Sequence, residues 1–191
     1  MTIKEEKDNE REVIIMNLYI SDLHFGHQNI IRLNHRPFSD ADAMDEAMIS
    51  LWNGRVSQDD HVYVIGDFAF RNGKAPQEYL KRLKGHKHLI IGNHDRQQTF
   101  DRNYFESIDQ IKRIKDGDKE IVLCHYPMAE WDGMFRDTWH IYGHIHNNLG
   151  ETYDIMKKKD HALNAGADIN NFTPVSFREL AENNRKFQRE H

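Results

Sequence analysis

Short apolar runs recur along the first half of the chain, and each of them ends at a group of polar residues. The runs lie at 13–20, 61–65 and 88–91. A short apolar run bounded by turn residues is typical of a strand that is buried in a sheet. The pattern therefore predicts three buried strands in this half of the chain.

Two segments between these runs carry the signals of helices. Residues 39–53 repeat apolar positions on one helix face, and Ser39 stands where an N-cap is expected. A second helix is predicted from Pro76, a residue favoured in a first turn, to Gly85, a residue favoured just past a last turn.

The second half of the chain is predicted to consist mainly of strands, followed by one last helix. Asp116-Gly117 is a strong hairpin signal between two strand-like segments, and Ser176 and Glu179 have the spacing of a capping box. The strands expected here are 107–115, 119–124, 139–142, 151–156 and 162–167. Strands that alternate with helices, followed by a strand-rich half, favour an α/β sandwich.

The composition is that of an ordinary globular domain. The chain has 191 residues, of which 38% are hydrophobic and 30% charged, which is enough for one domain with its own core. Residues 1–12 are charged and lack the apolar segment of a secretion signal, so we expect a solvated tail before a single domain over 13–191.

Other bulk features narrow the class of protein. No apolar run approaches the roughly 20 residues of a membrane span, and Cys124 has no second cysteine for a disulfide, which favours a cytoplasmic protein with no membrane contact. The formal net charge is -5, so strong nucleic-acid binding is not expected. The unusual feature is the presence of 13 histidines.

Five segments place metal-binding types of side chain directly after a predicted strand. Loops that follow strands of an α/β sheet converge in space although they are distant in sequence. Imidazole, carboxylate and amide donors suit divalent ions such as manganese, iron, nickel or zinc. The residues are Asp22 and His24; Asp67; Asn93, His94 and Asp95; His125; and His144 with His146.

The spacing within these segments has a local reason. In Asp-x-His and His-x-His the two side chains point the same way if the segment is extended. Gly66, Gly92 and Gly143 each precede a key residue, and glycine permits the sharp turn and close backbone approach of a metal-binding loop.

The five segments resemble the motif blocks of the calcineurin-like metallophosphoesterases. The blocks D-x-H, GD, GNH(D/E), H and GHxH stand in order within roughly residues 15–170. The resemblance implies an α/β fold in which two mixed sheets, flanked by helices, form a four-layer α/β/β/α sandwich. Residues 66–71 lack the GD-x-x-D-R-G continuation of the protein Ser/Thr phosphatases, so the chain is more similar to the small bacterial and phage-type members.

The same resemblance implies a role for each motif residue. Asp67 would bridge two ions, His94 would face the phosphate rather than a metal, and Asp95 would orient His94. One ion would be held by Asp22, His24, Asp67 and His146, and the other by Asp67, Asn93, His125 and His144.

A reaction follows from these roles. Two divalent ions, manganese first with iron, nickel or zinc as alternatives, would activate a bridging hydroxide that attacks the phosphorus of a small phosphate ester, while His94 assists the leaving group. A compact chain without a cap domain favours phosphodiesters over phosphomonoesters. Two alternatives remain open: a non-catalytic metal-binding scaffold for protein partners, and a nuclease that acts on nucleic-acid ends.

Three residues near the blocks are candidates for substrate contact. His27 and Arg36 follow the first block, and Arg96 follows the third. Arginine suits bidentate contact with phosphate. A structural salt bridge is an equally good interpretation of Arg36, as is a surface or helix-start role of Arg96.

Overall fold

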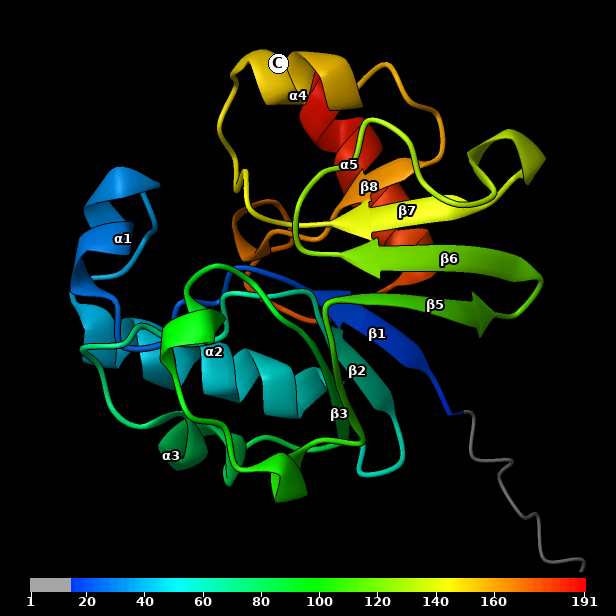
Figure 1. Ribbon diagram of the computed structural model, residues 1–191. Coiled ribbons are helices and arrows are strands. Elements are labelled where there is room, and N and C mark those ends of the chain that lie inside the picture. Colours follow the sequence, from blue (N-terminus) through cyan, green and yellow to red (C-terminus); the bar gives the residue numbers. More distant parts are fainter. Residues whose placement is uncertain (1–14) are drawn as a thin grey trace, which may run out of the picture.

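The computed structural model describes residues 15–191 and consists of two β-sheets packed face to face (Figure 1). The predicted tail at 1–12 lies outside the described residues. The first sheet has the strand order β4-β3-β2-β1-β9, and the second has the order β5-β6-β7-β8. Both sheets are mixed, because β9 runs antiparallel to β1 in the first and β5 antiparallel to β6 in the second, while the other neighbours are parallel.

The strands are short. Those of the first sheet are β1 (Asn17–Ile20), β2 (His61–Val64), β3 (His86–Ile90), β4 (Ser107–Asp109) and β9 (Val175–Ser176). Those of the second sheet are β5 (Ile111–Asp116), β6 (Lys119–Cys124), β7 (Trp139–Tyr142) and β8 (Ala162–Asn164). In register, Ile20 lies opposite Val64 and Val64 lies opposite Leu89, so the parallel strands β1 to β3 end at a common edge.

Helices and loops cover the outer faces of both sheets. The helices are α1 (Gln28–Leu33), α2 (Ala41–Arg55), α3 (Pro76–Leu80), α4 (Glu151–Met156) and α5 (Phe177–Glu190). Apolar residues of α2 and α3 share a buried cluster with the first sheet, and Met156 of α4 packs with Trp131 on the second sheet. A third cluster fills the space between the sheets, where Leu180 of α5 also packs. The predicted α/β sandwich of two mixed sheets flanked by helices is therefore confirmed.

One predicted strand is two strands in the structure. The segment 107–115 changes sheets at Gln110, so that β4 pairs with β3 and β5 pairs with β6. The hairpin predicted at Asp116-Gly117 is present, since Asp116 lies opposite Lys119. The long apolar-polar alternation hid the crossing between the sheets, because both halves read as strand.

The strand predicted at 151–156 is wrong, because this segment is helix α4. Its buried residues are Tyr153 and Met156, which are three positions apart and share a helix face. The β8 strand that follows pairs with β7 in parallel instead. Because β7 and β8 are parallel, a tight hairpin cannot join them, and a longer connection such as a helix is required.

The helix ends follow the sequence signals with small shifts. The N-cap of α2 is Asp40 rather than Ser39, and its carboxylate accepts the backbone N–H of Ala43 at 2.8 Å. The capping box of Ser176 and Glu179 is present at the start of α5. Helix α3 ends at Leu80, before the predicted end at Gly85.

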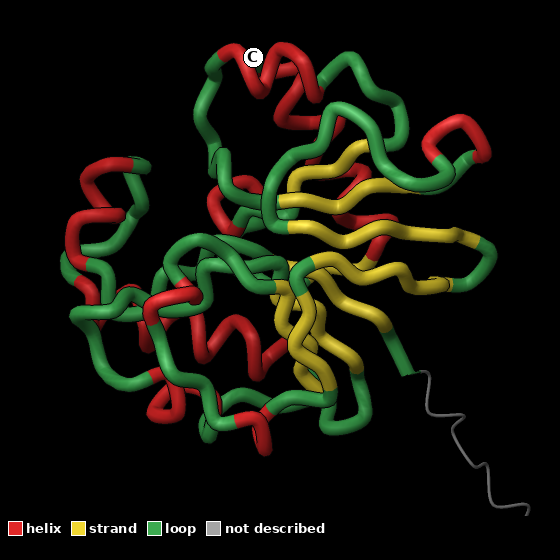
Figure 2. Tube along the Cα trace, viewed as in Figure 1, coloured by secondary structure: helices red, strands yellow, loops and turns green. Residues whose placement is uncertain are grey.

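Helix α1 and strand β9 were not predicted from the pattern. Across residues 15–191, none of the helices combines the length and the apolar character that crossing a bilayer requires. Figure 2 shows the loops, in green, that gather where strands of both sheets end.

Candidate metal centre

The predicted metal-binding side chains come together at the carboxyl ends of β1, β2, β3, β6 and β7. Asp67 lies at the middle of the group: its Oδ2 is 3.6 Å from Nε2 of His24 and 3.5 Å from Nε2 of His125. On one side, Nε2 of His146 lies 3.6 Å from Oδ1 of Asp22. On the other, Oδ1 of Asn93 lies 3.1 Å from Nε2 of His125.

The side chains form overlapping groups of possible ligand atoms that share Asp22, His24 and Asp67. Asp22, His24 and His146 offer ligand atoms within 4.8 Å of one another, and so do Asp22, Asp67 and His125. Nδ1 of His144 lies 3.0 Å from Oδ1 of Asn93, which itself lies 3.1 Å from Nε2 of His125. All seven predicted ligands are thus brought together, while the assignment of each to an ion stays a prediction.

The unsatisfied polar atoms of this site fit a bound cation. Both ring nitrogens of His24 are buried and have no hydrogen-bond partner in the described chain. A buried polar atom without a partner is costly, and a metal ion would satisfy one of these nitrogens by accepting its lone pair. The donors are imidazole, carboxylate and amide, a set that suits borderline divalent ions.

Candidate ligands occupy an uncommon backbone conformation. The φ angles are 57° at Asp22, 53° at His24, 56° at Asp67, 72° at His144 and 52° at His146. Left-handed conformations cost residues other than glycine about 1–3 kcal/mol each and tend to concentrate at functional sites. The Asp-x-His and His-x-His segments are therefore not extended, as the sequence suggested, and the turns themselves aim the side chains.

Two glycines make these turns possible. Gly66 has a φ of +82°, a conformation that residues with a side chain rarely adopt. Gly143 lies so close to Ser21 that a β-carbon would overlap the Ser21 hydroxyl and the Asp22 carboxylate. Glycine at these positions lets the loop after β7 approach the loop after β1.

The central carboxylate and its neighbouring imidazole polarise one another. Burial would raise the pKa of Asp67, but hydrogen bonding and the charge of His125 lower it to about 2. Burial would lower the pKa of His125, but Asp67 and Asp22 raise it to about 9. For His24, burial dominates and holds the pKa well below its ordinary value. The site is therefore built around an anionic carboxylate that attracts cations.

Asp95 supports the backbone rather than the ring of His94. Its buried carboxylate accepts backbone N–H groups of Gly92 at 2.8 Å, Asp67 at 2.8 Å and Phe68 at 3.0 Å. These bonds join the loop after β2 to the loop after β3. The predicted orientation of the His94 ring by Asp95 is not among the hydrogen bonds of the described residues.

The His94 side chain is partly exposed and lies beside His24. Its backbone N–H donates to Oδ1 of Asp67 at 2.9 Å, and its ring meets that of His24 edge-on, with centroids 4.9 Å apart. His94 also belongs to a geometric group with His24 and Asp67 that could hold an ion, so geometry alone permits a ligand role beside the predicted catalytic one.

The candidate substrate residues have different surroundings. The His27 ring stacks on Phe70 at 3.8 Å between centroids and lies 6.3 Å from the His94 ring, so His27 does border the site. Arg96 is exposed.

Arg36 is not a substrate contact, and this prediction needs correction. Its side chain is 0% exposed and pairs with Asp168, with Nε 2.9 Å from Oδ1. Its other N–H groups donate to the carbonyl oxygens of Asp22 at 2.7 Å and Leu23 at 2.8 Å. The chain folds back after α1, which buries the guanidinium beneath the first motif block.

Sequence reasoning missed Asp168, which accepts a hydrogen bond from His146 as well as from Arg36. It follows β8 closely, just as the motif residues follow their strands. The rule that polar residues after strands converge could have found it. The wrong assignment of 151–156 as a strand concealed β8 as a parallel neighbour of β7.

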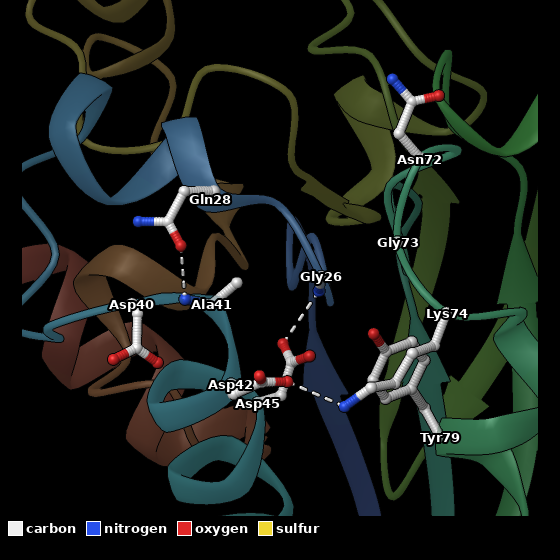
Figure 3. A pocket seen from close by; sticks show the side chains of 10 residues that line it. All are labelled: Gly26, Gln28, Asp40, Ala41, Asp42, Asp45, Asn72, Gly73, Lys74 and Tyr79. Atoms are coloured by element: carbon white, nitrogen blue, oxygen red, sulfur yellow. Dashed lines mark hydrogen bonds and ion pairs between the residues drawn. The ribbon is translucent and has the colours of Figure 1, made fainter.

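A hollow of about 410 Å³ lies beside this site but contains none of its candidate ligands (Figure 3). At its wall, the Gly26 N–H donates to Asp45 at 2.9 Å and the Ala41 N–H donates to Gln28 at 2.8 Å. These bonds tie the loop after the first motif block to α2. The residues that line the hollow therefore support this loop, and they are separate from the candidate metal ligands.

Proteins from several organisms are similar to the chain. It is 33% identical over 159 residues to the uncharacterized protein MJ1445 of Methanocaldococcus jannaschii, covering 82% of this chain and 84% of MJ1445. The crystal structure of AQ665, a protein of unknown function from Aquifex aeolicus, matches with a TM-score of 0.68 and 28% identity, covering 88% of this chain and 99% of AQ665. The nuclease MPE of Pseudomonas putida matches with a TM-score of 0.44 and 18% identity over 68% and 60% of the two chains.

No protein-family model matches the chain. The identity to MJ1445 extends over most of both sequences, which places the two proteins in one family. The two-sheet fold then holds the five motif blocks at one edge. The chain therefore belongs to the same family as MJ1445, and the five motif blocks by which it resembles the calcineurin-like metallophosphoesterases lie together in its structure.

Proposed function

We propose that this protein is a dinuclear metal-dependent phosphoesterase that hydrolyses phosphodiesters in preference to phosphomonoesters. The observation that carries the proposal is the convergence of imidazole and carboxylate donors from five loops around Asp22 and Asp67. Asp22, His24 and His146 would hold one ion, and Asn93, His125 and His144 the other, with Asp67 between them. When bound, two such ions polarise a phosphoryl group and lower the pKa of a coordinated water.

His94 has the position of a group that assists the leaving oxygen. Its ring lies beside His24 at the edge of the site, and its backbone is fixed by Asp67. A proton held on the ring would pass to the departing alkoxide, an effect worth roughly 10²–10⁴-fold in rate. His27, stacked on Phe70 and near His94, would contact the leaving group.

The preference for diesters is supported by the openness of the site. His144 is exposed, and Asn93 and His94 are partly exposed. A second ester arm therefore has room to extend away from the ions, and the same room gives a terminal phosphate no extra contacts.

The test is an assay of metal-stripped protein with one added metal at a time. The substrates are bis-p-nitrophenyl phosphate and p-nitrophenyl phosphate, each with Mn²⁺, Fe²⁺, Ni²⁺ or Zn²⁺. We expect no turnover without metal, and with Mn²⁺ a larger kcat/KM for the diester. Bound metal without turnover of either ester would contradict the proposal and favour a non-catalytic scaffold.

A further inference from the structure

We infer that Asp168, held by Arg36, is a positioning residue that orients His146 toward the ion it shares with Asp22 and His24. The inference rests on the proposed metal site. It assigns a function to two buried side chains that lie outside the motif blocks.

The two nitrogens of the His146 ring face two different carboxylates. Its Nδ1 lies 2.9 Å from Oδ2 of Asp168, while its Nε2 faces Oδ1 of Asp22 at 3.6 Å. An imidazole that donates Nδ1–H to a carboxylate keeps its lone pair on Nε2. Such a bond fixes the tautomer and the ring orientation of a metal ligand and raises its basicity.

Asp168 is itself fixed by a two-point contact with Arg36. Nε and one terminal nitrogen of the guanidinium lie 2.9 and 3.1 Å from the two carboxylate oxygens. The side chains are 0% and 2% exposed. Because Arg36 also donates to the Asp22 and Leu23 carbonyl oxygens, it couples the position of Asp168 to the first motif block.

The backbone of His146 is held as well. Its carbonyl oxygen accepts from Asn164 Nδ2 at 2.8 Å, and Oδ1 of Asn164 accepts the Gly166 N–H at 2.8 Å. His146 has a φ of 52°, so its direction depends on such support. The end of β8 thus holds the main chain of one candidate ligand, and the segment that follows β8 holds its ring.

The experiment compares metal affinity between Asp168→Ala and the wild type by calorimetric titration of metal-free protein with Mn²⁺. Loss of a carboxylate behind a metal-bound imidazole typically weakens metal affinity by roughly 10–100-fold. We expect a loss of that size for one of two ions, and an intermediate affinity for Asp168→Asn, which can still accept the Nδ1–H. Asp60→Ala is the matched control, because Asp60 is 1% exposed and accepts backbone N–H groups of Met16 and Ser57 before β2. Its affinities should equal those of the wild type.

A second measurement needs no variant. In ¹⁵N spectra of the Zn²⁺-loaded wild type, His146 should show a protonated Nδ1 and a metal-shifted Nε2. Wild type that binds no divalent ion would contradict the proposed function itself. Wild type that binds two ions, with unchanged affinities in a folded Asp168→Ala or with zinc on Nδ1 of His146, would overturn this inference alone.

Discussion

Single residues of the metal centre combine features that are unfavourable in isolation. His24 has two buried ring nitrogens without partners, and Asp67 is a buried carboxylate. Asp22, His144 and His146 adopt left-handed backbone conformations. Proteins tolerate such violations mainly at functional sites, where surrounding structure enforces them. A pair of cations would neutralise the buried charge and would accept the lone pair of one His24 nitrogen.

The roles of Asp67 and His94 are separated by two conservative substitutions. Asp67→Asn removes the central negative charge, so both the metal content and kcat should fall. His94→Gln should lower kcat by roughly 10²–10⁴-fold and leave the metal content unchanged. The measurements are steady-state kinetics and elemental analysis of the purified variants, with the exposed C-terminal His191→Gln as the control. Near-wild-type kcat in His94→Gln would rule out its catalytic role, and loss of metal would make His94 a ligand.

The residues that sequence alone could predict are those whose chemistry shows locally. The motif blocks combine distinctive residue types with strand ends, and the structure brings all seven predicted ligands together. Arg36 was ambiguous, because the sequence does not show which way a chain turns after a short helix. Asp168 was missed, because a single aspartate after a strand has no spacing partner. Arg36 and Asp168 contact each other although they lie 132 positions apart in the chain.

At the scale of elements, the hydrophobic pattern predicted where strands lie better than how they pair. The buried strands β1, β2 and β3 appear where the apolar runs are. The prediction was wrong where one apolar-polar segment contributes a strand to each sheet, on either side of Gln110. It was also wrong at α4, a short helix whose pattern resembles that of a strand. Short amphipathic segments are ambiguous between the two periods, and tertiary packing decides between them.

Strand β7 joins the second sheet to the loop that covers it, and this connection should be sensitive to pH. His140 is 0% exposed; its Nδ1 donates to the Val122 carbonyl oxygen at 3.1 Å, and its Nε2 accepts the Met128 N–H at 3.2 Å. Burial lowers its pKa to about 4. In the unfolded chain the imidazole has its ordinary pKa of about 6.5. As the pH falls, the unfolded chain therefore takes up a proton on His140 before the folded chain does. The stabilising contribution is complete above the unfolded pKa and is lost progressively down to about 4.

We expect the free energy of unfolding of the metal-free protein to fall between pH 7.5 and 5.5, with His140 contributing up to about 1.4 kcal/mol per pH unit below its unfolded pKa. His140→Gln, which can retain hydrogen bonding without titrating, should show a smaller loss. Urea unfolding at the two pH values measures the difference, with His191→Gln as the control. An equal loss in wild type and His140→Gln would show that His140 does not make this connection pH-dependent.

At the scale of the whole molecule, the site depends on both sheets. The first sheet supplies Asp22, His24, Asp67 and Asn93, and the second supplies His125, His144 and His146. The sandwich places the strand ends of both sheets side by side (Figure 1), and the apolar cluster between them holds this arrangement. Neither sheet alone carries a complete set of donors for two ions.

The most direct test is the anomalous diffraction of crystals grown with Mn²⁺. We predict two peaks at this edge, one in contact with Asp22, His24 and His146, the other with Asn93, His125 and His144, and Asp67 in contact with both. An ordered site that shows no peak at saturating Mn²⁺, or peaks that Asp67 does not touch, would contradict the account.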